Sequence, residues 1–393
     1  MCRWLPRTCI AAHTPAIRTG TDSSALCLRL VQEFGSDCML DDEMTLGTNV
    51  AKGHRLESPD MTSPSGSPAT HPPRSSPAGR PAVSIIMPAY NVEPFVGGAI
   101  ESVRSQTFSD FELVVVDDGS TDGTAAAVER HAQEDDRIRL VRQSNRGLSA
   151  ARNVALQQSR GAYLAILDSD DAWMPSFLDS QIGILERRPD VDIITTNAWF
   201  VGGSRSGRTA GPQPDPRPDP DLRHLLGDET AVFVMCVFRR RVYDAIGGFD
   251  EAFRSNEDYD FWIRAAMAGF RFARNDTPSA YYRRREDSLS ADELRMLKGI
   301  LRVYAKTREA LGQRPEELAI LDAQVERFET ERVAAEARHA LETGDHPAVQ
   351  EYLAALHRRR GGVMLRLASM MARWAPGLLS RAYRVRRLGL YGA

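Results

Sequence analysis

Short apolar runs alternate with segments of helical spacing from Val83 onward. The predicted strands are 83–87, 111–116, 138–142 and 163–167. The predicted helices between them begin at Pro94 and cover about 122–133 and 149–159. Pro88 closes the first of these runs. Strands that alternate with helices in this way form a parallel sheet with helices on both faces, so the pattern predicts an α/β fold.

The pattern continues less regularly beyond residue 170. We expect a helix at 175–187, strands at 191–196 and 231–238, and a helix at 257–268. Residues 202–222 are rich in Gly, Pro and charge, which is typical of an irregular loop inserted between core elements. Helical spacing with Glu, Ala, Leu and Arg then dominates 291–360. The expected domains are therefore 83–290 as an α/β domain, 291–356 as a helical appendage and 357–393 as a basic tail.

The first 82 residues show no sustained periodicity. Residues 58–81 form a run of Pro, Ser and Gly that buries too little apolar surface to offset the entropy of ordering. Residues 1–82 are therefore expected to be a disordered leader. They lack the continuous apolar stretch of a secretory signal, and Met61 is a candidate translation start.

Composition narrows the class of protein. The 393 residues are 42% hydrophobic and carry 50 Lys and Arg against 53 Asp and Glu, a balance that excludes a globally basic nucleic-acid binder. The longest apolar run of the body, 231–238, is too short to span a membrane. Four of the five cysteines precede residue 39, so a disulfide framework is not expected and a reducing, cytoplasmic compartment fits.

Carboxylates follow two of the predicted strands. Asp117 and Asp118 end the 111–116 strand, and Asp168, Asp170 and Asp171 follow the 163–167 strand. Ligands of open α/β sheets bind at this edge, so both groups are expected to meet there. The first pair alone is also typical of a turn with a helix cap. Three carboxylates within four residues repel one another unless donors or a cation compensate, and hard oxygen ligands suit Mg²⁺ or Mn²⁺.

Two further segments leave alternatives open. In 145–153 (NRGLSAARN), Arg152 lies either on a solvated helix face or near an anion at the helix N-terminus. In 256–262 (NEDYDFW), the acids either complement the helix dipole or include a general base beside aromatic rings.

Five motifs together carry a resemblance. They are SIIMPAYN (84–91), SQTFSDFELVVVDDGSTDGT (105–124), NRGLSAARN (145–153), YLAILDSDDAW (163–173) and GGFDEAFRSNEDYDFWIRAAMAGF (247–270). In this order and spacing they resemble the family 2 glycosyltransferases with a GT-A fold, over about residues 83–282. A dinucleotide-binding alternative is disfavoured because Gly97 and Gly98 belong to no G-x-G-x-x-G pattern.

The resemblance implies an open, mainly parallel GT-A sheet and an inverting, metal-dependent transferase. It would move a sugar from a nucleotide sugar, most often UDP-linked, to an acceptor hydroxyl of a polysaccharide, glycolipid or envelope glycan. The positions matching nucleotide-sugar motifs are Pro88, Tyr90, Asn91, Asp117, Asp118, Asn145, Gly147, Arg152, Asp168 and Asp170. Asp170 and Asp171 match the metal ligands (Mg²⁺ or Mn²⁺). Asp258 matches the catalytic base, with Glu257 as the alternative.

Two other classes remain as hypotheses. One is a catalytically silent protein that binds sugar nucleotides on the same fold, which the intact acidic motifs disfavour. The other is a nucleotidyltransferase, which normally needs a Gly-rich basic loop after the first strand, where this chain has PAYN at 88–91.

The tail is a separate signal. Residues 357–393 contain nine arginines and no acidic residue, interleaved with apolar residues. Such a segment predicts either a basic amphipathic helix at an anionic membrane surface or a helix packed on the catalytic core with solvated arginines. The first alternative places the protein at the cytoplasmic face of the membrane.

Overall fold

The computed structural model describes residues 79–285 and 288–390, so the predicted leader lies outside the described residues except for its last four positions. The described residues divide into two compact units, one ending at Arg332 and one beginning at Val333.

An eight-stranded sheet forms the centre of the larger unit. Its strands are β1 (Val83–Ala89), β2 (Phe111–Asp117), β3 (Ile138–Arg142), β4 (Tyr163–Ile166), β5 (Ala172–Trp173), β6 (Ile193–Val201), β7 (Cys236–Arg239) and β8 (Phe272–Arg283). Their order is β3-β2-β1-β4-β7-β6-β8-β5. The strands β1 to β4 are mutually parallel, as predicted, whereas β7 is antiparallel to both neighbours. Because β7 reverses direction, β6 and β8 again run parallel to β4, and their carboxyl ends share its edge.

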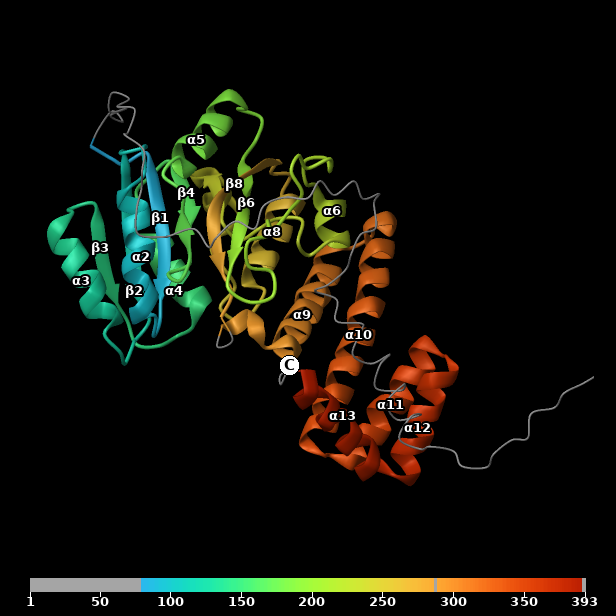
Figure 1. The fold of residues 1–393 in the computed structure, drawn as a ribbon. Helices are drawn as coiled ribbons and strands as arrows, with labels where there is room; N and C mark the ends of the chain where they lie inside the picture. Colours follow the sequence, from blue (N-terminus) through green and yellow to red (C-terminus); the bar gives the residue numbers. More distant parts are fainter. Residues whose placement is uncertain (1–78, 286–287, 391–393) are drawn as a thin grey trace, which may run out of the picture. The chain divides into compact units, whose positions relative to one another are not determined.

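Helices flank this sheet and extend the larger unit beyond it (Figure 1). They are α2 (Glu93–Arg104), α3 (Thr124–Glu134), α4 (Leu148–Gln158), α5 (Phe177–Arg187), α6 (Leu222–Gly227), α7 (Arg240–Ile246), α8 (Glu257–Met267), α9 (Glu293–Leu311) and the first part of α10 (Pro315–Thr343). Helix α9 packs on α8, where the rings of Tyr259 and Tyr304 meet edge to face. The start of the expected helical appendage is thus part of the core that positions α8.

Two sequence predictions need correction. Pro88 does not close the first strand, which continues to Ala89. The Leu167 N–H donates to the Ile86 carbonyl oxygen. The pairing of β1 with β4 ends at Ile86 and Ile166, before Pro88, so it needs no N–H from the proline. The apolar run 231–238 is a strand only from Cys236. Its first part is buried without strand pairing, since Phe233 N–H bonds instead to the Thr195 hydroxyl.

Between β6 and α6, residues 202–221 form no helix or strand, as predicted for the inserted loop. One isolated bridge, between Trp199 and Thr209, folds the start of this loop back onto β6.

A glycine next to β1 gives a test of this packing. A Cβ at Gly161 would lie 2.5 Å from Ser84 N and 2.7 Å from the Val83 carbonyl carbon, and neither backbone atom can move without moving the strand. We expect Gly161→Ala to destabilise the protein by about 1–3 kcal/mol, the usual cost of overpacking. Chemical denaturation measures this change.

Gly98, in the middle of α2, is the matched control because a Cβ there would meet nothing within 4 Å. Gly98→Ala is expected to stabilise by about 0.5–1 kcal/mol through helix propensity. Equal midpoints for the two variants would contradict the close approach at Gly161.

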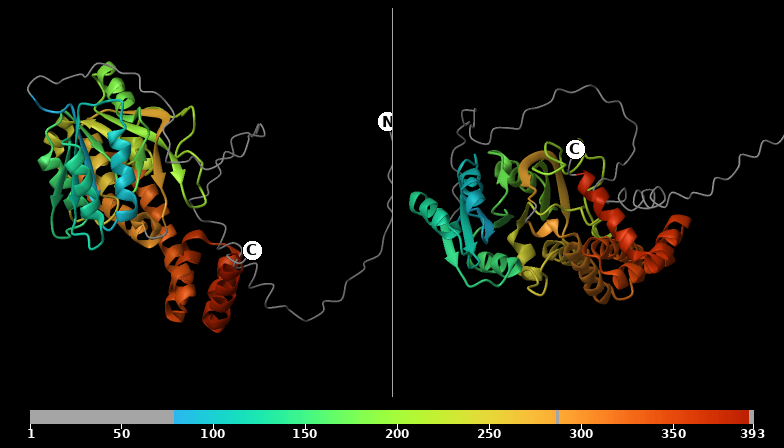
Figure 2. Two further views of the ribbon diagram at one scale, coloured as in Figure 1. Left: turned by 60° about the vertical axis from the view of Figure 1, so that its left-hand side comes forward. Right: turned by 60° about the horizontal axis from the view of Figure 1, so that its bottom comes forward.

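The smaller unit is helical. It contains the end of α10, α11 (His346–Arg360), α12 (Val363–Trp374) and α13 (Pro376–Leu390), shown in orange and red in Figure 2. Its core is formed by Ala337, Ala340, Leu341, Val349, Leu353, Ala368, Ala372, Leu379 and Tyr383. The tail forms two helices after α11 because Pro376 disfavours helical geometry at Ala375. Among the described residues, none of the helices has the length and apolar character that crossing a bilayer requires.

Candidate active site

The loops after β1 and β2 are tied together by Asn91. Its N–H donates to the Ser120 hydroxyl at 3.0 Å, and its side-chain oxygen accepts from Thr121 N at 2.8 Å. Asn91 has φ 51°, a strained value for a residue other than glycine. Pro88, in β1, is buried, whereas Tyr90, directly after β1, is 48% exposed. The arrangement leaves an aromatic ring accessible at the carboxyl edge of the sheet.

Asp117 and Asp118 are both buried but hold different segments. Asp117 accepts from Ser120 N at 3.1 Å and closes its own turn. Asp118 accepts from Gln143 Nε2 at 2.6 Å and from the N–H groups of Arg146 and Gly147, each at 2.8 Å. Asp118 therefore fixes the 143–147 loop.

The 143–147 loop presents Asn145 to solvent and ends at Gly147. Gly147 has φ 94°, and a side chain there would collide with the Arg254 guanidinium. Arg254 in turn donates to the carbonyl of Arg146 at 3.0 Å, and Arg146 pairs with Glu251 at 2.9 Å. These contacts join the NRG motif to the segment that precedes α8.

Arg152 lies at the centre of the site. It is 1% exposed, so it is not on a solvated helix face. Its Nη2 lies 2.6 Å from Asp168 Oδ1 and its Nη1 lies 2.5 Å from Glu257 Oε1. One guanidinium thus joins the end of β4 to the start of α8. Both carboxylates, together with Asp258, favour its charged form and raise its pKa despite burial.

The adjacent acids Glu257 and Asp258 differ in solvent exposure. Glu257 is buried against Arg152, and burial raises its pKa although Arg152 opposes the shift. Asp258 is half-buried and accepts from Tyr259 N at 2.9 Å. Within the described part of the chain it forms no ion pair. Burial also raises the pKa of Asp258, with Arg152 again opposing. Asp258 is thus the more accessible carboxylate of the two.

Tight packing fixes the start of α8. Asn256 precedes Glu257 with φ 59°, a left-handed conformation. Gly299 of α9 lies so close that a Cβ there would meet the side chains of both Ser255 and Asn256. Helix α9 therefore determines where the two acids stand.

The acids after β4 face two arginines, Arg283 at the end of β8 and Arg285 just after it. Arg283 N–H donates to Asp171 Oδ1 at 2.7 Å, and its Nε donates to the Asp170 carbonyl at 2.9 Å. Arg285 Nε lies 3.3 Å from Asp170 Oδ2. Burial, followed by the neighbouring carboxylates, raises the pKa of both Asp170 and Asp171. The repulsion expected from the sequence is present, and arginines compensate part of it.

Arg283 and Arg285 are the site residues that the sequence prediction missed. Arg283 ends β8, a strand that was not predicted, and Arg285 lies two residues beyond it, although the three consecutive arginines at 283–285 after two tyrosines were a visible signal.

The acidic cluster can accommodate a divalent cation. Among residues 79–285 and 288–390, no three His, Cys, Asp or Glu side chains are arranged to enclose a metal ion. Mg²⁺ or Mn²⁺, however, needs only one or two carboxylates when phosphate oxygens and water complete its shell. Asp170 is partly exposed, and Asp171 Oδ2 is buried with no hydrogen-bond partner among the described residues. These two groups fit such an ion.

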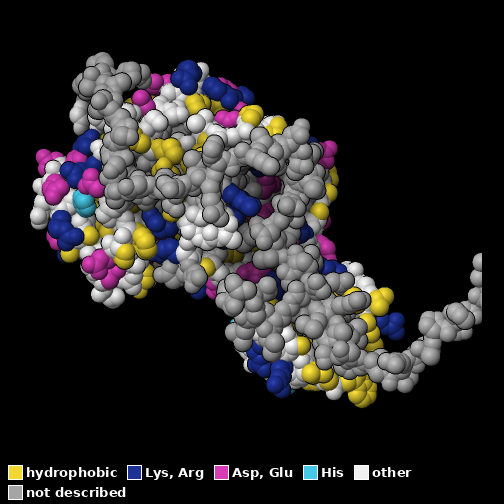
Figure 3. Space-filling model, in the orientation of Figure 1, with side chains coloured by type: hydrophobic (Ala, Val, Ile, Leu, Met, Phe, Trp, Pro, Cys, Tyr) yellow, Lys and Arg dark blue, Asp and Glu magenta, His cyan; other side chains and the backbone are white. Residues whose placement is uncertain are grey.

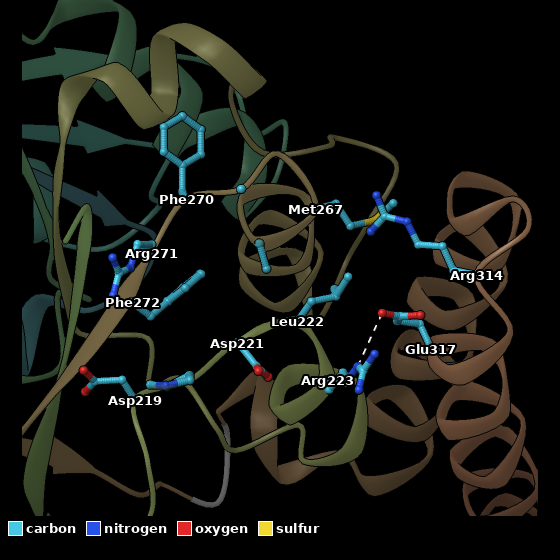
Figure 4. A pocket seen from close by; sticks show the side chains of 13 residues that line it. Asp219, Asp221, Leu222, Arg223, Met267, Phe270, Arg271, Phe272, Arg314 and Glu317 are labelled. Atoms are coloured by element: carbon cyan, nitrogen blue, oxygen red, sulfur yellow. Dashed lines mark hydrogen bonds and ion pairs between the residues drawn. The ribbon is translucent and has the colours of Figure 1, made fainter. Parts of the chain in front are cut away.

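A separate pocket of about 570 Å³ lies between α6, the end of α8, the start of β8 and α10 (Figure 4). It is lined by Leu222, Met267 and Phe272, with Arg223 paired to Glu317 across one side. Glu257 begins α8 and Met267 ends it, so this pocket lies at the helix end remote from the candidate base. The pocket does not belong to the site described above.

Residues 84–247 match the family model Glycosyl transferase family 2. The uncharacterized glycosyltransferase EpsJ of Bacillus subtilis is 32% identical over 220 residues, which cover 53% of this chain and 63% of EpsJ. The match thus spans less than two thirds of EpsJ. An uncharacterized glycosyltransferase of Haemophilus influenzae is 30% identical over 235 residues, covering 58% of this chain and 78% of the relative. The chain belongs to glycosyl transferase family 2.

Two solved structures share the fold. TarS 1–349 of S. aureus, in complex with UDP-GlcNAc, has a TM-score of 0.52 and 22% identity, covering 78% of this chain and 92% of that one. The mannosyltransferase PcManGT from Pyrobaculum calidifontis, in complex with GDP-Man and Mn²⁺, has a TM-score of 0.50 and 22% identity, covering 93% and 98%. The predicted GT-A type fold is confirmed.

Proposed function

We propose that the protein is an inverting glycosyltransferase that moves a sugar from a nucleoside-diphosphate sugar, UDP-linked, to an acceptor hydroxyl. One observation carries the proposal. Arg152 joins Asp168, at the carboxyl edge of the sheet, to Glu257, and so holds the accessible carboxylate of Asp258 beside that edge.

The donor's nucleotide would lie against the loops after β1, β2 and β3. Tyr90 offers an exposed ring for the base, and the buried Asp117 pairs in the sheet with Ala89, the residue before Tyr90. Asn91 and Asp118 shape the two loops, and Asn145, Gly147 and the partly exposed Asp168 complete the proposed donor surface. The complexes of TarS with UDP-GlcNAc and of PcManGT with GDP-Man support a nucleotide sugar as the ligand.

Departure of the nucleoside diphosphate builds negative charge, which must be offset. Asp170, with Asp171 as a second candidate, would hold Mg²⁺ or Mn²⁺, and the ion would act as a Lewis acid toward the diphosphate. The Mn²⁺ in the PcManGT complex supports this choice. Arg285 stands next to Asp170 and would add a fixed positive charge at the same place.

Asp258 is the proposed general base. Its raised pKa suits a group that takes a proton from an acceptor hydroxyl as the oxygen attacks the anomeric carbon. Attack on the face opposite the leaving group inverts the anomeric centre. Glu257 is engaged by Arg152, so its proposed role is to hold the start of α8.

The acceptor is proposed to be a polysaccharide, glycolipid or other envelope glycan. The irregular 202–221 segment returns onto β6 at Thr209 and is the candidate determinant of acceptor choice. We also propose that the protein works at the cytoplasmic face of the membrane, with peripheral contact through 357–393.

A screen of nucleotide sugars tests the proposal. With Mn²⁺ or Mg²⁺ present, one donor is expected to stabilise the fold by about 2.7 kcal/mol at a hundredfold excess over its Kd. The same donor should release nucleoside diphosphate in a metal-dependent reaction. Thermal shift and a diphosphate-release assay measure the two effects.

Binding of a donor without turnover on any acceptor would favour the catalytically silent alternative. Absence of binding for every nucleotide sugar would contradict both.

A further inference from the structure

The smaller unit buries only part of the apolar residues of its tail. Ala368, Ala372, Leu379 and Tyr383 belong to its core. A second set faces outward, and we call it the outer row: Val363 (73% exposed), Met370 (51%), Trp374 (81%) and Leu378 (49%). Positions 363, 370 and 374 recur at helical spacing along one side of α12, and Leu378 follows at the start of α13. Packing within the smaller unit therefore leaves one apolar face of the tail open.

Positive charge borders the outer row. Arg366 and Arg373 of α12 are exposed, as are Arg381 and Arg384 of α13. No Asp or Glu occurs anywhere in 357–393, so nothing acidic interrupts this border in the sequence. Figure 3 shows hydrophobic side chains gathered over this helical unit, with Lys and Arg beside them. An apolar strip bordered only by positive charge is complementary to a uniformly anionic surface with an apolar interior.

We propose that the outer row binds the surface of an anionic lipid bilayer. This deepens the membrane contact proposed above and assigns it to four side chains of α12 and α13. A helix of 12 residues is far too short to cross the hydrocarbon core, so α12 would lie in the plane of the interface. Trp374 would anchor it at headgroup depth, where tryptophan is favoured. The arginines would contact lipid phosphates.

The bilayer fits better than a protein partner. The centre of a protein interface is depleted of charged residues, and its rim is polar and solvent-accessible. Here α12 carries an exposed tryptophan and arginines with no acidic residue among them, which is the pattern of interfacial amphipathic helices.

Vesicle co-sedimentation of the full chain tests the proposal. We expect binding to phosphatidylcholine vesicles that contain phosphatidylglycerol, weakening as salt is added, and little binding to phosphatidylcholine alone. Joint replacement Met370→Ser and Trp374→Ser should weaken binding by about tenfold or more. Joint replacement Arg366→Gln and Arg373→Gln should weaken it and flatten the salt dependence.

The control removes the same number of positive charges from the surface of the larger unit. Arg130 of α3 and Arg187 of α5 are exposed on the larger unit, and Arg130→Gln with Arg187→Gln should leave vesicle binding unchanged. The substituted tail positions are all exposed: Arg366, Met370, Arg373 and Trp374. The melting temperatures of these variants should therefore match that of the parent protein, which would exclude misfolding as the cause of weaker binding.

Three outcomes would overturn the proposal. They are equal loss of binding in the control pair, equal binding to both vesicle types, and a dimer that Trp374→Ser dissociates while vesicle binding persists. Donor turnover without vesicles is a separate readout that the outer-row variants should not change. Its absence in the parent protein would contradict the proposed function and leave the vesicle result standing.

Discussion

Asp258→Asn is expected to lower kcat by about 10²-fold or more, the usual contribution of a general base, and to leave donor affinity within a few-fold. The reason is positional. Asp258 forms no ion pair within the described part of the chain, and its neighbour Glu257 carries the contact with Arg152. Steady-state transfer and donor titration measure the two quantities.

Asp260→Asn is the matched control two residues along α8. Asp260 is buried and pairs with Arg264 at 2.8 Å and Lys306 at 2.7 Å, so its loss should lower stability with a milder effect on kcat. If Asp258→Asn instead lost donor affinity and kept transfer, Asp258 would belong to the donor site and Glu257 would become the candidate base.

The pH profile of the parent enzyme checks the same assignment. A base acts when ionised, and burial raises the pKa of Asp258 above 3.8. The acid limb of kcat/KM is therefore expected above pH 3.8, with activity lost as the pH falls through the raised pKa. Asp258→Asn should remove that limb from the residual activity.

Asp170→Ala is expected to abolish metal-dependent donor turnover while the fold stays intact. Of the two candidate metal ligands, Asp170 is partly exposed and Asp171 is buried, and the pKa of Asp170 is raised by burial and by Asp168. Without it, a divalent ion would lose its most accessible protein ligand. Diphosphate release at saturating Mn²⁺ measures the effect, and a chelator should inactivate the parent protein similarly.

The exposed Asp179 of α5 provides a control, since Asp179→Ala removes a carboxylate away from the site. Thermal stabilisation by Mn²⁺ together with UDP should disappear in Asp170→Ala and persist in Asp179→Ala. Full turnover by Asp170→Ala at saturating Mn²⁺ would remove the metal role from this residue.

Local pattern was enough to predict the first half of the sheet. The strands at Phe111 and Ile138 begin where predicted, because branched apolar residues dominate the first and recur in the second. The carboxylates after β2 and β4 were predicted to meet at one edge, since parallel strands end together. Contacts of Asn91 with Thr121 and of Asp118 with Gly147 place the loops after β1, β2 and β3 there.

Local pattern failed where distant segments decide the structure. Strand β8 contains Asn275, Asp276 and Pro278, and its pairing with β6 shifts register beside them, so it shows no regular alternation. The role of Arg152 depended on Glu257, which lies 105 residues away. No spacing rule connects such positions, and only the folded chain distinguishes the buried acid from its accessible neighbour.

The shared guanidinium of Arg152 also constrains how the site can change. Asp168 and Glu257 come from separate elements, yet each is compensated by the same buried cation. Neutralising either one alters the electrostatic environment of the other, so the two positions are expected to be epistatic, with effects that do not add. Substitution of Asp168, proposed above as part of the donor surface, is therefore expected also to disturb the start of α8, and compensating changes should be sought at Glu257 first.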